Sequence, residues 1–389
     1  MPDLPRISLP EPGTLRGGWP PYRWGIGGLT PLLAALFAAA LLPLIAGLVL
    51  FGWNSIRVLA ICVAAALLTE AACRGVSRRT DPWAREQAVL MGVLMAATLP
   101  PTVRWTVPWL AVVVAVAFGQ ILSGGAGNYL WHPVAVGRVL VQLLFSDELS
   151  PRQWPILAAG RLLWGNLSHA RPLPELATWS SRPLPSGVDA WLVVRPADVL
   201  QQAVPATPGQ APSEALSALL RDHLPPWIDT LTGVAGGAVG EAGALAVLLA
   251  GLILMWRGLL PWTLAVGGVL AAGLLAIVLP VSIGSPALDN SLWFPGFTFA
   301  QGVPVGLAYA VYHLSAGEFL FVLLLLAPDP TSSPLTHRGH LLFGLIIGAA
   351  TMLLRIGVGL PGAGYWALLL ANTAVPAINH LTRRRVFGT

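Results

Sequence analysis

The chain has 389 residues, of which 55% are hydrophobic and only 10% are charged, whereas soluble domains carry about a quarter charged residues. This composition excludes an ordinary soluble protein, and several apolar runs reach the ~20 residues that cross a bilayer. The net charge of +5 is expected to orient the chain in a membrane, because no basic run with interleaved aromatic residues, apart from the terminal arginines, indicates nucleic-acid binding.

Ten apolar segments follow one another along the chain, in two groups of five. An N-terminal segment rich in proline and glycine, 1–27, precedes the first group in 28–147. A polar insert, 148–232, with an amphipathic stretch at Ser213–His223, separates it from the second group and a short tail in 233–389. We therefore predict an all-α polytopic membrane protein with about ten transmembrane helices. The predicted spans are 28–52, 55–73, 86–103, 105–122, 132–147, 235–255, 259–281, 299–327, 340–356 and 363–381.

The arginines predict the orientation, because the chain contains no lysine and short positively charged loops stay in the cytoplasm. With ten spans, the arginines that precede the first helix, follow the second, sixth and eighth, and end the chain lie on one side. Only Arg57, Arg104 and Arg355 lie near short connections on the other side. We expect both termini in the cytoplasm and the insert outside it.

A weak internal repeat relates the two groups of helices. The third predicted helix ends in Leu99-Pro100-Pro101 and the eighth in 327–330, Ala-Pro-Asp-Pro, while Gly-Ala-Gly precedes both the fifth and the tenth helix. Five helices in each half give an inverted repeat, in which binding sites lie at the repeat interface on interrupted helices. The alternative is a chance similarity of glycines and prolines.

The stretch GGAGNYLWHPVAVGR contains the first group of candidate site residues. Gly124, Gly125 and Gly127 are predicted either to line a cofactor pocket or to let helices pack closely. His132 is either a hydrogen-bonding or titrating group or a structural histidine. Arg138 lies inside the next apolar run, where a charged side chain faces a ligand or pairs with a buried carboxylate.

A second group of polar residues interrupts the apolar runs of the last five helices. Glu241 follows several glycines and is interpreted as part of an ion path or as the N-terminal cap of the sixth helix. His313, Ser315 and Glu318 break a long apolar run, which predicts a discontinuous helix at a cofactor or ion site, or interhelical hydrogen bonds. Either Glu241 or Glu318 is a candidate partner of Arg138.

The hydroxyls of Thr331 and Ser332, between prolines, are predicted either to cradle a cofactor phosphate or to lie in a solvated cytoplasmic loop. Cys62 and Cys73 lie in one predicted helix, about 16 Å apart, too far for a disulfide. We predict no metal site and no side chain that acts as nucleophile or general acid–base.

Four blocks of this sequence resemble a known family, the RnfD/NqrB family of membrane subunits from the Rnf electron-transport complex and the sodium-translocating NADH:quinone reductase. They span most of the chain in the family's order. The blocks are 91–105 (MGVLMAATLPPTVRW), 124–138, 232–251 (TGVAGGAVGEAGALAVLLAG), and 313–344 with the Asn372, Pro376 and RRRV ending.

The resemblance implies a flavin-carrying subunit with ten helices in a multi-subunit oxidoreductase of the bacterial inner membrane. Its partners are other membrane subunits, among them a flavin-bearing extracytoplasmic one. Electrons pass through the bound flavin, and their flow is coupled to movement of H⁺ or Na⁺. In the sodium-translocating relative, the glycines that match Gly124 and Gly125 resemble part of the quinone site, so riboflavin or quinone are further candidate ligands.

The resemblance also implies a covalent cofactor site in the insert. The family esterifies FMN phosphate to the threonine of a Ser/Thr-Gly-Ala-Thr motif, and Thr207 in VPATPGQAP is the matching threonine. Val204 and Pro205 replace the first two motif residues, and Gln201 and Gln202 stand where an aspartate is expected. Two alternatives therefore stay open: a scaffold subunit that has lost covalent FMN, and a channel or transporter of related fold.

Overall fold

The computed structural model describes residues 29–77, 83–125, 128–149, 154–157, 190–193, 196–200, 204–205, 210–224, 227–233, 237–285, 288–297, 299–300 and 303–382. Each of the ten predicted segments contains a helix within these ranges. In the first half the helices are α1 (Leu29–Phe51), α2 (Trp53–Ser77), α3 (Ala84–Thr98), α4 (Thr106–Ala117), which continues as a π-helix (Phe118–Leu122), and α5 (Pro133–Leu144).

The second half also contains five of the predicted segments, two of which include π-helical turns. It contains α10 (Ala244–Trp256), α11 (Trp262–Val278), α12 (Val305–Ser315), α13 (Phe319–Phe321) with a π-helix (Val322–Leu326), α14 (His337–Met352) with a π-helix (Leu353–Val358), and α15 (Ala363–Leu381). Thr336 caps α14, because its hydroxyl accepts a hydrogen bond from the backbone N–H of Gly339 at 3.0 Å.

By length and composition, three described helices are able to cross a membrane: Pro31–Phe51, Trp53–Gly75 and His337–Val358. A fourth span results if α12 and the helix Phe319–Leu326 are taken together, although they are bent by 58° at a short break. The chain is thus a mostly helical membrane protein, and the bend confirms the predicted discontinuity near Ser315. The arrangement of ten spans stays a prediction.

The prediction of an all-α fold is wrong in the insert and between α11 and α12, where short strands form. Val204–Pro205 (β3) pairs in parallel with Val281–Ser285 (β4), which pairs with Leu288–Trp293 (β5). The eighth predicted segment begins with strands rather than helix. The other short elements are α6 (Ser146–Leu149), β1 (Trp154–Leu157), β2 (Ala190–Val193), α7 (Pro196–Val199), α8 (Pro212–Ala218) with a π-helix (Leu219–His223), α9 (Trp227–Thr232), a 3₁₀ turn (Pro295–Phe297), β6 (Phe299–Ala300) and β7 (Val303–Pro304).

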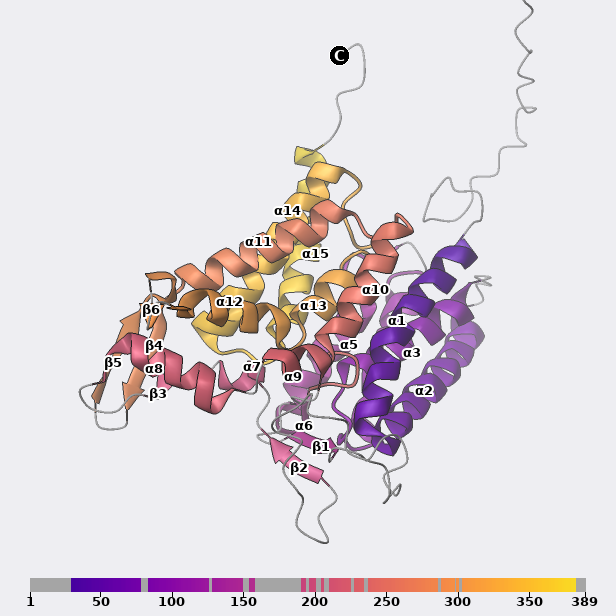
Figure 1. The fold of residues 1–389 in the computed structure, drawn as a ribbon. Helices are drawn as coiled ribbons and strands as arrows, with labels where there is room; N and C mark the ends of the chain where they lie inside the picture. Colours follow the sequence, from indigo (N-terminus) through magenta and orange to yellow (C-terminus); the bar gives the residue numbers. More distant parts are fainter. Residues whose placement is uncertain are drawn as a thin grey trace, which may run out of the picture.

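The two ends of the described helical body point to the same side of the molecule (Figure 1). α1 begins and α15 ends at the top of the view, whereas α7, α8, α9 and the strands β1 to β5 lie along the lower and left side. The strand pairing explains this grouping, because β3 joins the insert to the connection between α11 and α12. The two halves meet where α1 packs against α10.

Candidate functional site

α3 stops in the interior of the protein, and its end organises the site. Leu99 adopts an extended conformation, and Pro100 and Pro101 prevent the helix from continuing. The last carbonyls of a helix lack partners within it, but here they are paired by the segment before α10. The N–H of Gly240 donates to the carbonyl of Ala97 at 2.7 Å, and that of Val239 donates to Leu99 at 3.0 Å.

Arg138 on α5 pairs the carbonyl of Thr98, which lies between those of Ala97 and Leu99 at the end of α3. Its Nε donates to the carbonyl of Thr98 at 3.1 Å, and its Nη1 donates to Oε1 of Gln142 at 2.6 Å. The side chain is buried, and a cation at the C-terminal end of a helix is favoured by the helix dipole. Its guanidinium carbon also lies 5.2 Å from the centre of the Tyr365 ring, which is within range of a cation–π contact.

Glu241 binds Tyr365 and does not cap a helix. The Tyr365 hydroxyl on α15 donates a hydrogen bond to Glu241 Oε1, and both side chains are buried. α10 begins at Ala244 with Gly243 as its N-cap and no side-chain hydrogen bond there. The cap interpretation of Glu241 is therefore wrong, and the carboxylate belongs to a buried polar cluster.

Glu318 pairs with Arg355, a residue that the sequence analysis places near a short connection outside the cytoplasm. Arg355 is fully buried, and its Nη2 lies 2.9 Å from Glu318 Oε1. The same oxygen accepts a hydrogen bond from the N–H of Gly364, in the first turn of α15, at 3.2 Å. Arg355 Nη1 donates to the carbonyls of His313 and Ala316, at 2.7 and 3.3 Å. Thus a buried arginine pairs backbone carbonyls at the end of each of two helices, Arg138 at the end of α3 and Arg355 at the end of α12.

We call Arg138, Glu241, Glu318, Arg355 and Tyr365 the charged cluster. Tyr365 lies at its centre, because its hydroxyl reaches Glu241, its ring contacts Arg138, and its neighbour Gly364 binds Glu318. The sequence identified three of these residues and missed the other two. Tyr365 lies among apolar residues and glycines in the sequence, and Arg355 lies near the end of a predicted span, where an arginine is expected beside a connection.

His313 and Ser315 lie at the end of α12, beside this cluster. The ring of His313 packs edge-on against Tyr309, with 4.5 Å between the ring centres, and neither of its nitrogens has a hydrogen-bond partner in the described part of the chain. Ser315 donates instead to the carbonyl of Val311 in its own helix, at 2.8 Å. His313 is thus a buried polar group available to a ligand or water, whereas Ser315 is already satisfied.

A small cavity of about 50 Å³ lies between α1, α3, the connection before α5 and the turn after Leu326. We call it the α1–α3 pocket. One wall is apolar, formed by leucines of α1 and by Leu90, Met91 and Leu94 of α3. The polar residues that line it are Gln87, Tyr129, His132, Asp329 and Thr331.

The polar wall of the α1–α3 pocket is a hydrogen-bonded group. The Tyr129 hydroxyl is in hydrogen-bonding contact with the side chains of Thr331, Asp329 and Gln87, and burial, with the Asp329 charge, raises the pKa of Tyr129 well above its ordinary value. His132 Nδ1 and Gln87 Oε1 lack a hydrogen-bond partner among the described residues. The pocket therefore offers both donors and acceptors to a polar ligand edge.

Ser332 lies beside the α1–α3 pocket but is not among the residues that line it. Its hydroxyl donates to Asp329 Oδ2 at 3.2 Å, and its carbonyl accepts from Asn372 Nδ2 at 3.0 Å. Asn372 also donates to the carbonyl of Leu130. This residue of α15 is therefore hydrogen-bonded both to the connection before α5 and to the turn after Leu326.

The glycine cluster and the insert threonine are placed only in part. Gly124 and Gly125 have φ of 84° and 99°, a region that favours glycine, and they turn the chain after the π-helix. They do not line the α1–α3 pocket, although Tyr129, His132 and Pro133, which follow in the same connection, do. Gly127 and Thr207 lie outside the described residues. The described residue nearest to Thr207 along the chain is Pro205, in β3.

Metal and disulfide chemistry has no visible site in the described ranges. No group of three or more His, Cys, Asp or Glu side chains is placed there to hold a metal. Cys62 and Cys73 are both free and buried in α2.

The fold and the site define a mostly helical membrane protein with a buried charged cluster near the end of α3 and the bend after α12. The chain belongs to the NQR2, RnfD, RnfE family, whose model matches residues 30–388. This match confirms the resemblance found in the sequence.

Three relatives are similar to this chain over nearly their whole length, and each is the D subunit of an ion-translocating oxidoreductase complex. The protein of Stutzerimonas stutzeri is 30% identical over 361 residues, which cover 90% of this chain and 89% of that protein. The protein of Pseudomonas paraeruginosa is 30% identical over 388 residues, covering 99% and 96%. The protein of Halorhodospira halophila is 29% identical over 360 residues, covering 92% and 89%.

Proposed function

We propose that this chain is an integral subunit of an ion-translocating oxidoreductase complex in a bacterial inner membrane. The observation that carries the proposal is the full-length similarity to proteins that bear this name. The charged cluster supports it, because buried ionisable residues inside a membrane are costly and mark ion or substrate paths. In this role the chain acts with other membrane subunits, including a flavin-bearing extracytoplasmic one.

The proposed architecture is ten transmembrane helices as two inverted repeats of five, with both termini in the cytoplasm. Several features of the two halves correspond. α4 and α14 each continue as a π-helix, which ends in a turn containing glycines of positive φ and leads into α5 or α15. A helix in each half also stops at prolines, α3 before Pro100 and the helix ending at Leu326 before Pro328.

The proposed redox group is FMN, attached to Thr207 in the extracytoplasmic insert. β3 supports this site, because its pairing with β4 holds Val204 and Pro205, three and two residues before Thr207, at the edge of a sheet. An edge strand is also where a proline is tolerated. The departures from the family's motif thus keep a defined strand before the threonine, although they change the side chains that a flavin transferase would meet.

A second, noncovalent ring ligand, riboflavin or quinone, is proposed for the α1–α3 pocket. The unpaired His132 Nδ1 and Gln87 Oε1 suit the polar edge of such a ring. Asp329 disfavours a phosphate at the same place, because two negative charges repel. The cavity of about 50 Å³ holds only a few waters, so a ring fits only after the leucine wall of α1 moves.

The test is to purify the complex with its membrane partners and to detect flavin fluorescence in a denaturing gel, followed by intact mass. We expect a fluorescent band with the added mass of FMN, and loss of both in Thr207→Ala. Ser217→Ala, another hydroxyl of the insert whose Oγ donates to the carbonyl of Glu214, is the matched control and keeps the band.

A dark wild-type band contradicts covalent attachment. Flavin released into the supernatant on denaturation then supports a subunit with noncovalent flavin, and its absence supports the scaffold alternative, which the altered residues Val204 and Pro205 favour. Ion conduction by the isolated chain without any flavin supports the channel alternative instead.

A further inference from the structure

α10 and α11 follow one another in the chain but diverge after the connection between them (Figure 1). Both helices pack against the π-helix Val322–Leu326. Glycines let this π-helix come close: a Cβ at Gly251 of α10 would lie 2.9 Å from Leu324 Cδ1, and one at Gly268 of α11 would lie 2.4 Å from Leu323 Cδ1. The π-helix therefore supports both helices from the inside of the molecule.

An apolar groove of about 330 Å³ lies between the two helices, and we call it the α10–α11 groove. Leu252 and Met255 belong to one wall, Val266 and Val269 belong to the other, and the buried Leu324 of the π-helix lies at its base. All its lining residues are apolar side chains or glycine. Its volume is in the range of ligand-binding pockets.

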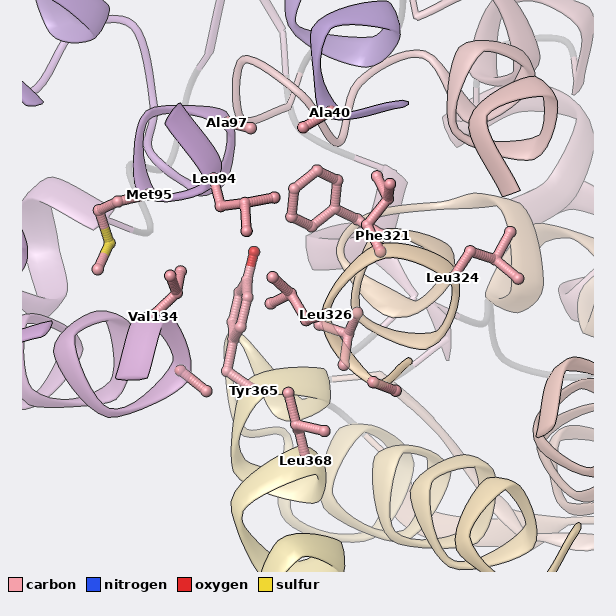
Figure 2. Packing of buried hydrophobic residues seen from close by; sticks show 14 of the residues in the cluster. Ala40, Leu94, Met95, Ala97, Val134, Phe321, Leu324, Leu326, Tyr365 and Leu368 are labelled. Carbon is pink, nitrogen blue, oxygen red and sulfur yellow. The ribbon is translucent and has the colours of Figure 1, made fainter. Parts of the chain in front are cut away.

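The groove is separate from the sites described above. None of its lining residues lines the α1–α3 pocket. Figure 2 shows Leu326 beside the Tyr365 ring, whereas Leu324 lies on the opposite side of the same helical turn. The π-helix thus presents one side to the charged cluster and the other to the groove.

The chemistry of the groove excludes a polar ligand. A buried polar group needs a hydrogen-bond partner, and no lining side chain supplies one. The groove opens to the outer surface of two predicted spans, since Leu252 and Val266 are 58% and 40% exposed. It extends about 10 Å along α10, from Leu248 to Met255. An elongated apolar ligand, such as an acyl chain, matches this shape.

One end of the groove lies beside the connection from α10 to α11. Met255 and Ala265 line this end, and the connection carries Arg257 between Trp256 and Trp262, all three of which are exposed. Arg257 is the only charged residue in the sequence 242–288. Tryptophans are enriched at the bilayer interface, and basic residues there attract anionic lipid headgroups. A positive charge therefore lies at headgroup level, next to an apolar groove.

We propose that the α10–α11 groove binds one acyl chain of an anionic phospholipid, whose headgroup phosphate pairs with Arg257. The apolar walls bind the chain, and Arg257 selects a negative headgroup. A transmembrane helix of another subunit is about 10–12 Å wide with its side chains, too wide to enter a groove of this volume and length. The inference goes beyond the proposed redox role and does not require it.

The test is photocrosslinking of the purified complex in nanodiscs of phosphatidylcholine and phosphatidylglycerol. One probe is phosphatidylglycerol with a diazirine in an acyl chain, and the other is phosphatidylcholine with the same chain. Peptide mapping by mass spectrometry gives the yield at each site. We expect several-fold more crosslinking at 248–255 and 265–270 than around Leu274, which is exposed on α11 outside the groove. In the groove the phosphatidylglycerol probe should exceed the phosphatidylcholine probe several-fold.

Two pairs of variants test the headgroup and the chain separately. Arg257→Gln should make the yields of the two probes equal, whereas Arg85→Gln, at an exposed arginine of α3, should keep the preference. Val266→Trp fills the groove and should lower the yield of both probes several-fold. Leu274→Trp places the same side chain on α11 outside the groove and should leave the yield unchanged. If Val266→Trp does not assemble, Arg257→Gln at its exposed position still decides.

Three results overturn the inference. The first is an equal yield in the groove and around Leu274. The second is a headgroup preference that Arg257→Gln leaves unchanged. The third is a photoreactive residue at position 269 that crosslinks to another subunit instead of lipid, which assigns the groove to a protein partner. All these yields are measured without turnover, so a negative result leaves the proposed oxidoreductase role intact.

Discussion

At the scale of single residues, the structure distinguishes a buried ion pair from an exposed one. Arg355 and Glu318 are almost completely excluded from solvent, whereas Arg104, which lies 3.4 Å from Glu148, has 80% of its side chain exposed. Exposed pairs contribute about 0–1 kcal/mol, and removing one partner of a buried pair costs about 3–5 kcal/mol. The two pairs therefore form a natural comparison within one chain.

We expect Glu318→Gln to destabilise the protein by about 3–5 kcal/mol, because it leaves the Arg355 charge buried without its counterion. Glu148→Gln, the matched control, should change stability by less than about 1 kcal/mol. The measurement is the thermal unfolding midpoint of the purified complex in detergent. Replacing both Glu318 and Arg355 by Gln should cost less than Glu318→Gln alone. Equal midpoints for Glu318→Gln and Glu148→Gln would show that the buried pair contributes nothing.

At the scale of elements, glycines bring α11 and α14 into backbone contact. A Cβ at Gly348 would lie 2.2 Å from the carbonyl oxygen of Gly268, and one at Gly344 would lie 2.2 Å from that of Leu264. Such close approach of small residues drives helix association in membranes. The two helices are thus held by backbone proximity, which larger side chains prevent.

Gly348→Ala should separate α11 from α14 and destabilise the protein by about 1–3 kcal/mol or more, the usual cost of overpacking. Gly357→Ala is the matched control in the π-helix that follows α14, because a Cβ there meets nothing within 4 Å. Thermal unfolding in detergent, with the yield of folded protein, measures both. An unchanged midpoint for Gly348→Ala would mean that the contact is looser than the structure has it.

At the scale of the whole molecule, the described ends of α1 and α15 lie on one side and the insert elements on the other (Figure 1). The arginines predict that the first of these sides faces the cytoplasm. The two native cysteines are buried, so they give little background to surface labelling.

A membrane-impermeant maleimide should therefore label Glu214→Cys, at an exposed site on α8, from outside intact cells. His337→Cys, at the start of α14, should be labelled only in inverted vesicles. Wild-type protein controls for the native thiols. Labelling of both positions from the same side contradicts the ten-span topology, because an odd number of crossings would no longer separate them.

Much of the helical framework could be predicted from the sequence, because apolar runs and prolines act locally. The break after Ser315 and the end of α3 at Leu99 follow from local signals of this kind. The strand β3 could not be predicted, since its partner Ile283 lies far along the chain. The hydrogen bond between Tyr365 and Glu241 could not be predicted either, because these residues are 124 positions apart in the chain. A tyrosine in an apolar helix has the same sequence pattern whether it fills the core or binds a carboxylate.

The way in which α3 ends has a consequence for synthesis of the protein. Its terminal carbonyls are paired by Val239 and Gly240, which the ribosome makes only after the whole insert. A nascent chain therefore waits for the insert to be translated before the carbonyls of Ala97 and Leu99 are paired as they are in the folded protein. At roughly 5–20 residues per second, this wait lasts many seconds. We therefore expect the first half to reach its final packing only after the segment before α10 has been made.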